Sequence, residues 1–588
     1  MKTSNKKNVG VVSLKSGVSF RVWAPNADQV YLIGTFNDWQ KQLMKNEMDG
    51  YWHIFIKNAQ IGQEYKYIIE NDDKVITHND PRSFYCTTAS GASVITNRNF
   101  DWGDDEYINP NTNEQIIYEL HIGTFNREDL SINGDFESAI KKLDYLRELG
   151  VTTIELMPIS TMAMDRGWGY GIDYIYSVES LYGGHYGFKK FIKEAHRRNM
   201  GVVLDVVYNH LGPDTSLDLW QFDGWNEDDY GGIYFYNDWR AETPWGNTRP
   251  DYGRPEIHQY FIDNVRYLIH DFRLDGLRVD STLYIRNVAG HDGDPSNDLA
   301  EGWELLQKIN KVSKAINPNA ITIAEDNGRN DYITKTQDDG GAGFSTQWDL
   351  ELSSLLKNLL STDQTDKINF SGLDFELSRK INDDGFQRVI FIDSHDSAAN
   401  GSSRFIETIS PKINNSLFAR KQALIAATII MTIPGIPMIF QGQEILEGGS
   451  FNDWQGINWK LAEKNSSVVE AYKQLIKLRK NSLNVSKGLT GQNFSILNFD
   501  DSNKVLAYRR WENGGANDDT VIIINFSNKS FDNYSLNFPS DGEWKLAFCS
   551  TDKQYIKESK VDINKTIIVE HGSANLIVPA STAMIFHH

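Results

Sequence analysis

Four apolar runs of this chain each close on acidic residues, and this pattern constrains the fold more than any other feature of the sequence. The runs are VVLDVVYNH at 202–210, LDGLRVD at 274–280, ITIAED at 321–326 and VIFIDSHD at 389–396. Short continuous apolar runs separated by helix-like stretches are typical of the buried parallel strands of a barrel. A polar residue that ends such a strand points into the site at the C-terminal face of the barrel. We therefore expect Asp280, Glu325 and Asp396 to converge on one pocket.

The central part of the chain alternates between strand-like and helix-like segments. Strand candidates lie at 116–125, 152–160, 201–208, 275–280, 320–325, 344–349, 388–393 and 436–444, and helix candidates at 136–150, 187–199, 256–272, 301–315 and 416–432. Strands that alternate with helices in this way predict a (β/α)8 TIM barrel, which we place at 106–484. The segment 211–255 is too long for an ordinary connection, and we expect it to wall the substrate cleft.

Both ends of the chain have the alternating pattern of antiparallel strands. Residues 1–105, which include VSFRVWAPNADQVYLIGTFNDW, are predicted to form an N-terminal β-sandwich. Residues 485–588 are predicted to form a C-terminal antiparallel β domain. A chain of 588 residues is too long for one ordinary core, which agrees with a multidomain α/β protein.

Charge and composition exclude several classes of function. The formal net charge of -20 repels nucleic-acid phosphates and anionic lipids, so a neutral substrate is favoured over either partner. No apolar stretch reaches the roughly 18 residues that a membrane span needs. The N-terminus lacks the pattern of a signal peptide, and Cys86 and Cys549 suit a reducing compartment, so the predicted location is cytoplasmic. The sequence does not indicate the oligomeric state.

Asp280 and Glu325 are of the right type to cleave a glycosidic bond with retention of configuration. Two carboxyl groups about 5 to 5.5 Å apart can protonate the leaving oxygen and stabilise an oxocarbenium-like centre. Arg278 lies on the same strand face as Asp280, where its guanidinium would keep a nucleophile ionised. Burial behind the apolar ITIA run would raise the pKa of Glu325, which suits an acid/base. His395 and Asp396 are placed to bind sugar hydroxyls and favour a cationic transition state.

Each motif also has a structural explanation, because a lone acid after a strand is more often a helix cap or a loop residue. Asp205 could pair with an arginine, His395 could be a core histidine, and Asn209 could be a turn residue rather than a metal ligand. Four such segments in barrel order favour a catalytic site. A hydrolytic metal centre is disfavoured because no His-x-x-x-His or cysteine cluster accompanies the acids, and no phosphate loop indicates an organic cofactor.

In their order along the chain, DVVYNH, GLRVDSTLY, IAED and FIDSHDS resemble the four signatures of the α-amylase superfamily, glycoside hydrolase family 13. The resemblance implies a retaining mechanism on α-glucosidic bonds, with Asp280 as nucleophile, Glu325 as acid/base and Asp396 as transition-state stabiliser. It also implies substrate contacts for Tyr170, which would stack beneath the sugar, and for His210, Arg278 and His395. We add Asp205 to these substrate-binding residues.

The same resemblance raises the question of calcium. Asn209 matches a position that binds calcium in many amylases. A calcium site needs about six to eight oxygen ligands, and the sequence does not supply the rest. We therefore expect no required cofactor, with calcium possible but unsupported.

The whole chain is similar to glycogen branching enzymes and maltooligosyltrehalose trehalohydrolases. Both begin with a sandwich like that of a carbohydrate-binding module, with FRVWAP and FNDW, and continue with a YELHIGTF-like strand. SHD is more like branching enzymes, whereas YNHLGP, TPWG and the Asn after IAED are more like trehalohydrolases. Many branching enzymes have Glu after SHD, where this chain has Ser397. We predict 1,4-α-glucan branching. The alternatives are an α-glucan hydrolase, such as a trehalohydrolase or amylase, and a non-catalytic glycan-binding protein.

Overall fold

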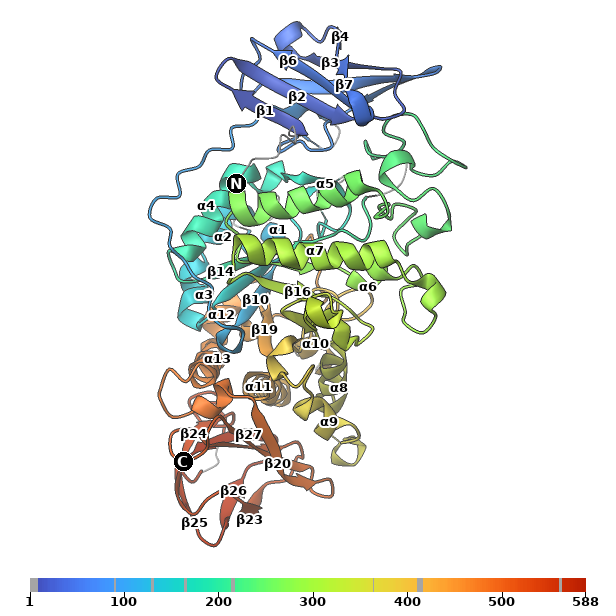
Figure 1. The fold of residues 1–588 in the computed structure, drawn as a ribbon. Coiled ribbons are helices and arrows are strands. Elements are labelled where there is room, and N and C mark those ends of the chain that lie inside the picture. The colour runs from blue at the N-terminus through green and yellow to red at the C-terminus, as the bar shows by residue number, and fades with distance from the viewer. Residues whose placement is uncertain are drawn as a thin grey trace.

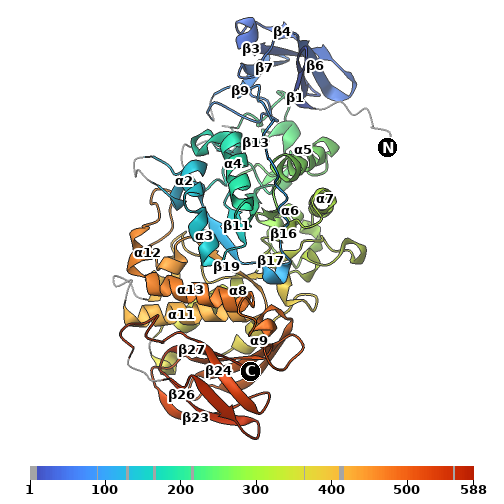
Figure 2. The same cartoon turned by 90° about the vertical axis from the view of Figure 1, so that its left-hand side faces the viewer.

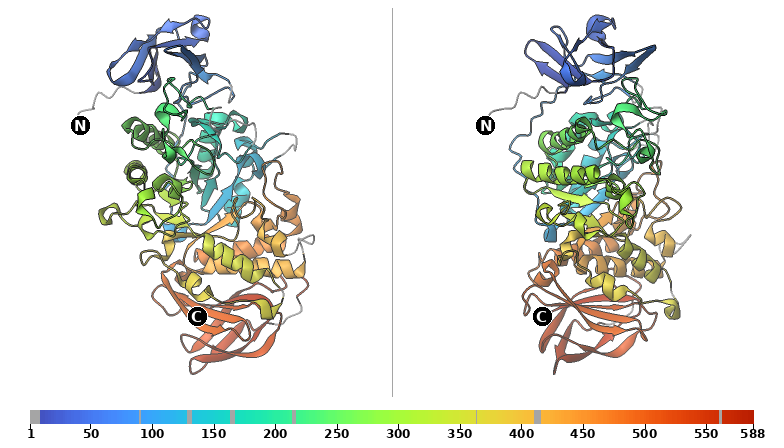
Figure 3. Two further views of the ribbon diagram at one scale, coloured as in Figure 1. Left: turned by 90° about the vertical axis from the view of Figure 1, so that its right-hand side faces the viewer. Right: turned by 45° about the vertical axis from the view of Figure 1, so that its right-hand side comes forward.

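A computed structural model of the protein describes residues 9–588 except 89–90, 128–131, 163–166, 213–216, 363, 410–415 and 560–562. The chain forms an N-terminal β domain, a central barrel and a C-terminal β domain, which lie in a row (Figure 1). Views from other sides keep this order, with the barrel between the two β domains (Figures 2 and 3). In the part of the chain that is described, no helix has the length and apolar character to cross a membrane.

The barrel is a closed ring of parallel strands, eight of them within the described residues. They are β10 (Ile117–Leu120), β11 (Thr153–Leu156), β14 (Gly201–Val206), β15 (Gly276–Val279), β16 (Ile321–Ala324), β17 (Thr346–Trp348), β18 (Arg388–Ile390) and β19 (Ile436–Phe440). The ring closes where β10 pairs with β19. Each strand lies inside a range that the sequence indicated, so the predicted (β/α)8 barrel is confirmed.

Helices surround the ring, as the central part of Figure 1 shows. The main ones are α2 (Phe136–Ile140), α3 (Leu143–Leu149), α4 (Gly184–His196), α5 (Pro255–Arg266), α7 (Ala300–Ile316), α8 (Leu350–Leu360), α11 (Leu417–Thr432) and α13 (Ser466–Arg479). The single helix expected at 136–150 is two helices, α2 and α3. Helices α8 and α13 lie outside the helix ranges that the sequence indicated. Asp349 caps α8 by accepting a hydrogen bond from Leu352 N.

Gly276 lets two strands that carry the expected catalytic acids approach each other closely. It opens β15, and its Cα is paired with that of Ile321 in β16. A Cβ atom at position 276 would lie 1.9 Å from the Ile321 carbonyl oxygen, so a larger residue would push the strands apart. The glycine therefore brings the ends of β15 and β16, and with them Asp280 and Glu325, side by side.

The N-terminal domain is a sandwich of two antiparallel sheets, as predicted. One sheet has the order β1 (Gly10–Leu14), β2 (Gly17–Trp23), β6 (Tyr51–Ile56) and β5 (Lys45–Asn46). The other has the order β4 (Gln42–Leu43), β3 (Gln29–Gly34), β7 (Glu64–Asn71) and β8 (Lys74–His78). Alternate residues of the strands, such as Phe20, Val22 and Tyr67, are buried between the sheets.

The C-terminal domain is also antiparallel β structure, as predicted. Its larger sheet has the order β20 (Asn493–Asp500), β21 (Val505–Trp511), β22 (Thr520–Asn525), β27 (Thr582–His587), β24 (Gly542–Cys549) and β25 (Thr566–Val569). Strands β23 (Phe531–Asn537) and β26 (Ser573–Val578) form a second sheet. Arg510 of β21 docks this domain on the barrel, because its guanidinium donates to the carbonyl of Thr432 at the end of α11.

The long segment 211–255 forms hydrogen bonds with the N-terminal domain. We had expected this segment only to form a wall of the substrate cleft. Asp223 is fully buried and accepts hydrogen bonds from the backbone N–H of Asn26 at 2.8 Å and from its side-chain amide at 2.9 Å. Lys74 donates to the carbonyl of Gly224 at 2.8 Å. Residues 213–216 of the segment lie outside the described residues.

Candidate active site

A cleft of about 490 Å³ lies at the C-terminal ends of the barrel strands. The three predicted acids, Asp280, Glu325 and Asp396, all line it. The other lining residues are Met162, Gly167, Trp168, Gly169, Tyr170, Gly171, His210, Trp245, Ser281, Tyr284, Asn327, His395 and Asn400. The expectation that the three acids share one pocket is therefore met, although their separate roles stay predictions.

Arg278 ties the first two acids together from below. Its Nη1 donates to Oδ1 of Asp280 at 2.9 Å, and its Nη2 lies 2.9 Å from Oε2 of Glu325. The guanidinium has no exposed surface, so solvent screens its interaction with the two acids only weakly. The two carboxyl groups are thereby fixed side by side against one cation.

The electrostatics of the two acids differ. Burial raises the pKa of Glu325 to about 7, with further upward contributions from Asp280 and Asp396 and a downward one from Arg278. Glu325 is therefore suited to carry a proton near neutral pH, as the sequence suggested. For Asp280 we expected Arg278 to dominate, but burial outweighs the guanidinium and the pKa is raised above its ordinary value. The desolvation of a carboxylate that is only 6% exposed explains this correction.

Ser281 follows Asp280 in an unusual backbone conformation. Its φ of 40° and ψ of 56° lie in the left-handed region, which a residue other than glycine rarely adopts. This turn aims the Ser281 backbone N–H at Oε2 of Glu325, to which it donates at 2.9 Å. Residues in such conformations gather at active sites, where the surrounding structure holds them. The turn thus couples the position of one acid to the other.

His395 and Tyr170 form one wall of the cleft. Their rings are stacked at 5.1 Å between centroids with an interplanar angle of 21°. The Tyr170 hydroxyl donates to Oδ2 of Asp205 at 2.6 Å and contacts Nε2 of His395 at 2.9 Å. The other ring nitrogen of His395 is 2.5 Å from Oε1 of Glu119. Burial lowers the pKa of His395, but Asp396 and Glu119 outweigh it and bring the pKa to about 9, so the ring is an imidazolium at neutral pH.

Two of the predicted substrate-binding residues lie one layer deeper than the others. Asp205 and Arg278 do not belong to the cleft lining, and they form an ion pair at 2.6 Å with 4% and 0% of their surfaces exposed. The structure gives them contacts to Tyr170, Asp280 and Glu325. Their direct contact with a sugar stays a prediction, and the structural alternative for Asp205, pairing with an arginine, agrees with its geometry.

His210 also lines the cleft, with its ring hydrogen-bonded to the backbone of Tyr170. Burial lowers its pKa to about 4, so the ring is neutral at physiological pH. It stacks on Trp245 with 4.7 Å between centroids and 18° between the planes. The Trp245 ring is 46% exposed and contacts Tyr284 edge-to-face at 5.2 Å. Trp245 comes from the segment 211–255, which therefore does contribute to the wall of the cleft.

The side chain of Asn209 forms hydrogen bonds within the site rather than ligating a metal ion. Its side-chain amide donates to Oδ2 of Asp280 at 2.6 Å and to the Asp280 carbonyl at 2.9 Å, while its oxygen contacts Nδ1 of His210. Both ends of the amide are thus engaged. Within the described residues there is no group of three or more His, Cys, Asp or Glu side chains that could hold a metal ion. The residues around Asn209 do not fit a calcium site.

Several residues of the site were not identified from the sequence. Trp245 and Tyr284 lacked any periodic signal, although the TPWG motif that contains Trp245 was noted as a family feature. Glu119 and Glu155 lie inside apolar strands rather than at strand ends, so the search for acids at strand ends did not indicate them. Ser397, which stands where many branching enzymes have Glu, does not line the cleft. Its hydroxyl accepts a hydrogen bond from Ser394 N at 2.9 Å instead.

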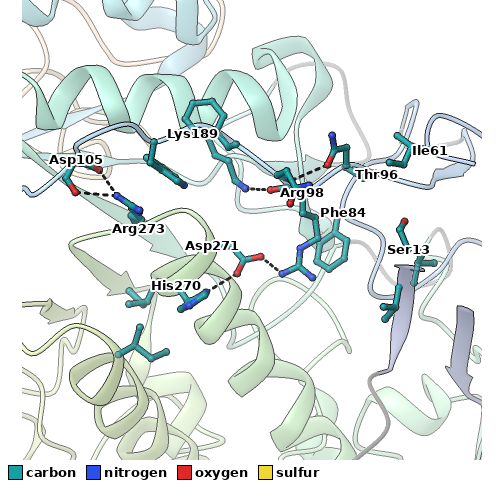
Figure 4. A pocket seen from close by; sticks show the side chains of 18 of the residues that line it. Ser13, Ile61, Phe84, Thr96, Arg98, Asp105, Lys189, His270, Asp271 and Arg273 are labelled. Atoms are coloured by element: carbon teal, nitrogen blue, oxygen red, sulfur yellow. Dashed lines mark hydrogen bonds and ion pairs between the residues drawn. The ribbon is translucent and has the colours of Figure 1, made fainter. Parts of the chain in front are cut away.

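A larger cavity of about 880 Å³ lies away from the acids, between the N-terminal domain and the barrel. Figure 4 shows charged side chains of this cavity that contact one another, while Lys189 donates to the carbonyl of Arg98. Arg98 and His270 contact Asp271, and Arg273 contacts Asp105 at 3.4 Å. Because the three predicted acids line the smaller cleft and not this cavity, the smaller cleft is the candidate active site.

Comparisons with known proteins agree with this architecture. The family described as alpha amylase, catalytic domain matches residues 81–217 and 218–458. Residues 8–83 match carbohydrate-binding module 48 (isoamylase N-terminal domain), and residues 496–588 match the alpha amylase C-terminal all-beta domain. The fold also resembles a pullulanase from Anoxybacillus solved with maltotetraose, with a TM-score of 0.77, 18% identity and coverage of 99% of this chain and 87% of that one.

Curated relatives match over most of their length. A 1,4-alpha-glucan branching enzyme of Oceanobacillus iheyensis is 30% identical over 573 residues, covering 91% of this chain and 86% of its own. A branching enzyme of Clostridium perfringens is 29% identical, covering 92% and 84%. A malto-oligosyltrehalose trehalohydrolase of Saccharolobus solfataricus is 30% identical, covering 79% and 86%. With the catalytic-domain match spanning the barrel and its acids, the chain belongs to the α-amylase family.

Proposed function

We propose that this protein is a retaining α-glucan branching enzyme, which cleaves an α-1,4 bond and transfers the released segment to a 6-hydroxyl. The observation that carries the proposal is the paired arrangement of Asp280 and Glu325 on one buried guanidinium. Two relatives that cover 91% and 92% of the chain are named branching enzymes. Asp280 acts as nucleophile, Glu325 as acid/base and Asp396 as stabiliser of the transition state.

In the first step, Asp280 attacks the anomeric carbon of the donor glucan while Glu325 gives its proton to the departing 4-oxygen. The bond between the sugar and that oxygen breaks, and an ester between Asp280 and the sugar forms. The pKa of about 7 for Glu325 allows it to hold this proton at neutral pH. Asp396, half exposed beside the imidazolium of His395, is placed to stabilise positive charge on the sugar.

In the second step, the carboxylate of Glu325 takes the proton of an acceptor 6-hydroxyl, whose oxygen attacks the anomeric carbon. The ester breaks, Asp280 leaves as a carboxylate, and an α-1,6 bond forms with the original configuration. Water in place of the sugar hydroxyl gives hydrolysis by the same route. The exposed ring of Trp245, braced by His210 and Tyr284, offers a sugar acceptor an aromatic face at the mouth of the cleft.

The remaining predicted residues have supporting roles in this proposal. Tyr170 and His395 present a stacked wall to the sugar at the cleavage site, and His210 contacts the sugar as a neutral imidazole. Arg278 and Asp205 hold the nucleophile and Tyr170 from beneath. No step requires a cofactor.

Proton NMR of the purified protein incubated with amylose tests the proposal. Growth of α-1,6 anomeric signals with few new reducing ends supports branching. Reducing ends without α-1,6 signals contradict it and indicate hydrolysis.

A second candidate is the hydrolysis of maltooligosyltrehalose with release of trehalose. It is favoured by the 30% identity with the trehalohydrolase of Saccharolobus solfataricus and by Ser397, which accepts a hydrogen bond from Ser394 N and does not line the cleft. Incubation with a trehalose-terminated malto-oligosaccharide distinguishes it. If free trehalose appears faster than α-1,6 bonds form on amylose, trehalose-releasing hydrolysis replaces branching as the assigned activity.

A further inference from the structure

Three carboxyl groups lie inside the barrel directly below the cleft. Glu119 of β10 and Glu155 of β11 are paired in register, so their Cα atoms lie about 4.8 Å apart and their side chains point to one face. Glu155 is also paired with Val203 of β14, and Asp205 lies two residues further on the same face of that strand. Val203 belongs to the apolar cluster of the barrel interior. The three acids, which we call the carboxyl cluster, are therefore inside the ring, with 1%, 2% and 4% of their surfaces exposed.

Two members of the carboxyl cluster have cationic partners that belong to the active site. Glu119 contacts the imidazolium of His395 at 2.5 Å. Asp205 contacts Arg278 at 2.6 Å and accepts the Tyr170 hydroxyl through the same oxygen, Oδ2. Glu119 therefore needs its negative charge to pair with His395, which lines the cleft. Asp205 needs its negative charge to pair with Arg278, which contacts the acids of the cleft.

Glu155 has no such partner among the described residues. No lysine, arginine or histidine forms an ion pair with it there, and its Oε2 is buried without a hydrogen bond. The Oδ1 atom of Asp205 is likewise buried and unpartnered. Two carboxylate oxygens without a donor between neighbouring strands would leave two costly unsatisfied acceptors. A proton on one of them supplies the missing donor, directly or through a water molecule that bridges the pair.

Electrostatics favour Glu155 as the carrier of that proton. Burial raises its pKa well above the ordinary value, and the charge of Glu119 on the adjoining strand β10 adds to the rise. Asp205 on β14 acts in the same direction. Arg278 on β15 and His395 after β18 oppose it, but they are already held by the other acids of the cluster. Of the three carboxyls, Glu155 is thus the one without an ion-pair partner of its own among the described residues.

We propose that Glu155 is a positioning residue: its neutral carboxylic acid completes the hydrogen bonding of the carboxyl cluster, so that Glu119 and Asp205 keep their charges for His395 and Arg278. Glu155 lies below the cleft and does not line it. It acts on the reaction through Arg278, which holds Asp280 and Glu325, and through His395, which lies 3.4 Å from Asp396. This inference rests on the proposed catalytic function of the cleft.

The test compares three single variants of the full chain. Glu155→Gln keeps the shape and a hydrogen-bond donor but cannot ionise. Glu155→Leu removes both the donor and the acceptor. Thr346→Val is the matched control, because Thr346 is a fully buried residue of β17 whose hydroxyl also lacks a partner, and it pairs with Ile323 rather than with the cluster. The readouts are kcat and KM on amylose across pH, the melting temperature, and the infrared difference spectrum of wild type minus Glu155→Gln.

The neutral-acid role predicts a specific pattern. Glu155→Gln keeps both limbs of the wild-type pH profile and loses the carbonyl band of a protonated carboxyl from the infrared spectrum at neutral pH. Glu155→Leu keeps KM but loses about 100-fold in kcat, the scale expected when reacting groups are displaced by about 1 Å. Its melting temperature falls, since the loss of the donor leaves Oδ1 of Asp205 buried and unsatisfied. Thr346→Val matches the wild type in kcat and pH profile.

Other results would overturn the inference. If a limb of the pH profile shifts in Glu155→Gln, Glu155 is ionised in the wild type. The same follows if the infrared difference spectrum shows no lost band of a protonated carboxyl. Wild-type kcat in Glu155→Leu means that it positions nothing. Failure of the proposed function is distinguishable: if amylose is hydrolysed rather than branched, the same pH profiles are measured on hydrolysis. The infrared band tests the proton on Glu155 without any substrate.

Discussion

The backbone N–H of Ser281 donates a hydrogen bond of 2.9 Å to Oε2 of Glu325. Ser281 directly follows Asp280, so the turn that ends one barrel strand fixes an acid at the end of the next. Because Arg278 also contacts both acids, the pair is held from the side and from below. This arrangement makes the protonation of Glu325 and the position of Asp280 depend on each other, and it leads to the first prediction.

The pH dependence of turnover is expected to have a basic limb near pH 7. The donor step needs protonated Glu325, whose pKa burial raises to about 7, so kcat/KM falls as the pH rises through this value. Initial rates on malto-oligosaccharides between pH 4 and 10 would show it. A limb that appears only above about pH 9 would contradict the assignment of Glu325 as the acid.

The same group links stability to pH. Glu325 has a folded-state pKa above its ordinary value of 4.5, so the native state binds the extra proton between about pH 4.5 and 7. Its contribution to stability is therefore greatest at low pH and falls as the pH rises through this window, by up to about 3 kcal/mol at 1.36 kcal/mol per pKa unit. Glu325→Gln cannot lose a proton, so its melting temperature should decline less than that of the wild type between pH 5 and 8, to be measured by calorimetry.

Substitution of the two acids should separate their roles. Asp280→Asn removes the nucleophile and should lower kcat by about 10⁴-fold or more. Glu325→Gln should still accept a glucosyl fluoride, whose leaving group needs no proton, but should hydrolyse the ester slowly, so a glycosylated protein accumulates in mass spectra. Glu444→Gln is the matched control, since Glu444 is a fully buried glutamate with a pKa of about 7 outside the cleft. If Glu444→Gln accumulated the ester and Glu325→Gln did not, the assignment would be wrong.

Tyr170→Phe should impair the reaction without blocking binding. The hydroxyl joins Asp205 to His395, and its loss leaves the buried Asp205 carboxylate with one donor fewer. The loss of one partner of a buried hydrogen-bonding group costs about 1 to 3 kcal/mol. If that cost appears in the transition state, kcat falls about 10-fold to 100-fold while KM changes little. Steady-state kinetics on malto-oligosaccharides would show an unchanged kcat if the bridge had no part in the reaction.

Trp245→Ala should change the fate of the glycosyl ester. Loss of the exposed ring removes an aromatic face for the acceptor, so the ratio of α-1,6 bonds to reducing ends should fall several-fold, in line with about 1 kcal/mol of lost stacking. Trp239→Ala is the control, because Trp239 is an exposed tryptophan of the same segment that does not line the cleft. Equal product ratios in the two variants, measured by proton NMR, would refute an acceptor role for Trp245.

Asp223→Ala should loosen the N-terminal domain without affecting the chemistry. The buried carboxylate holds both the backbone and the side chain of Asn26, and its removal should cost about 1 to 3 kcal/mol. Glu227→Ala, at an exposed position of the same segment, provides the comparison. Faster proteolysis near the domain junction is expected only for Asp223→Ala, with kcat on short malto-oligosaccharides unchanged in both. A matching loss of kcat would show that the domain supports the active site.

The sequence by itself determined the barrel and the place of its three acids. Buried strands need continuous apolar runs, and the residue that ends a parallel strand must face the common C-terminal edge, so Asp280, Glu325 and Asp396 could be assigned to one pocket. The raised pKa of Glu325 also followed from its apolar neighbours. The antiparallel domains at the two ends followed from the alternation of apolar and polar residues.

Other features were decided only by the tertiary structure. Glu119 and Glu155 each interrupt an apolar strand, and only the closed ring shows that both point inward beside Asp205. Trp245 reaches the cleft from a long connection whose path no local pattern predicts. The pKa of Asp280 depended on how completely the fold excludes water, which outweighed the neighbouring guanidinium. Periodicity and strand ends are local properties of the chain, whereas inward contacts and desolvation arise from residues far apart in sequence.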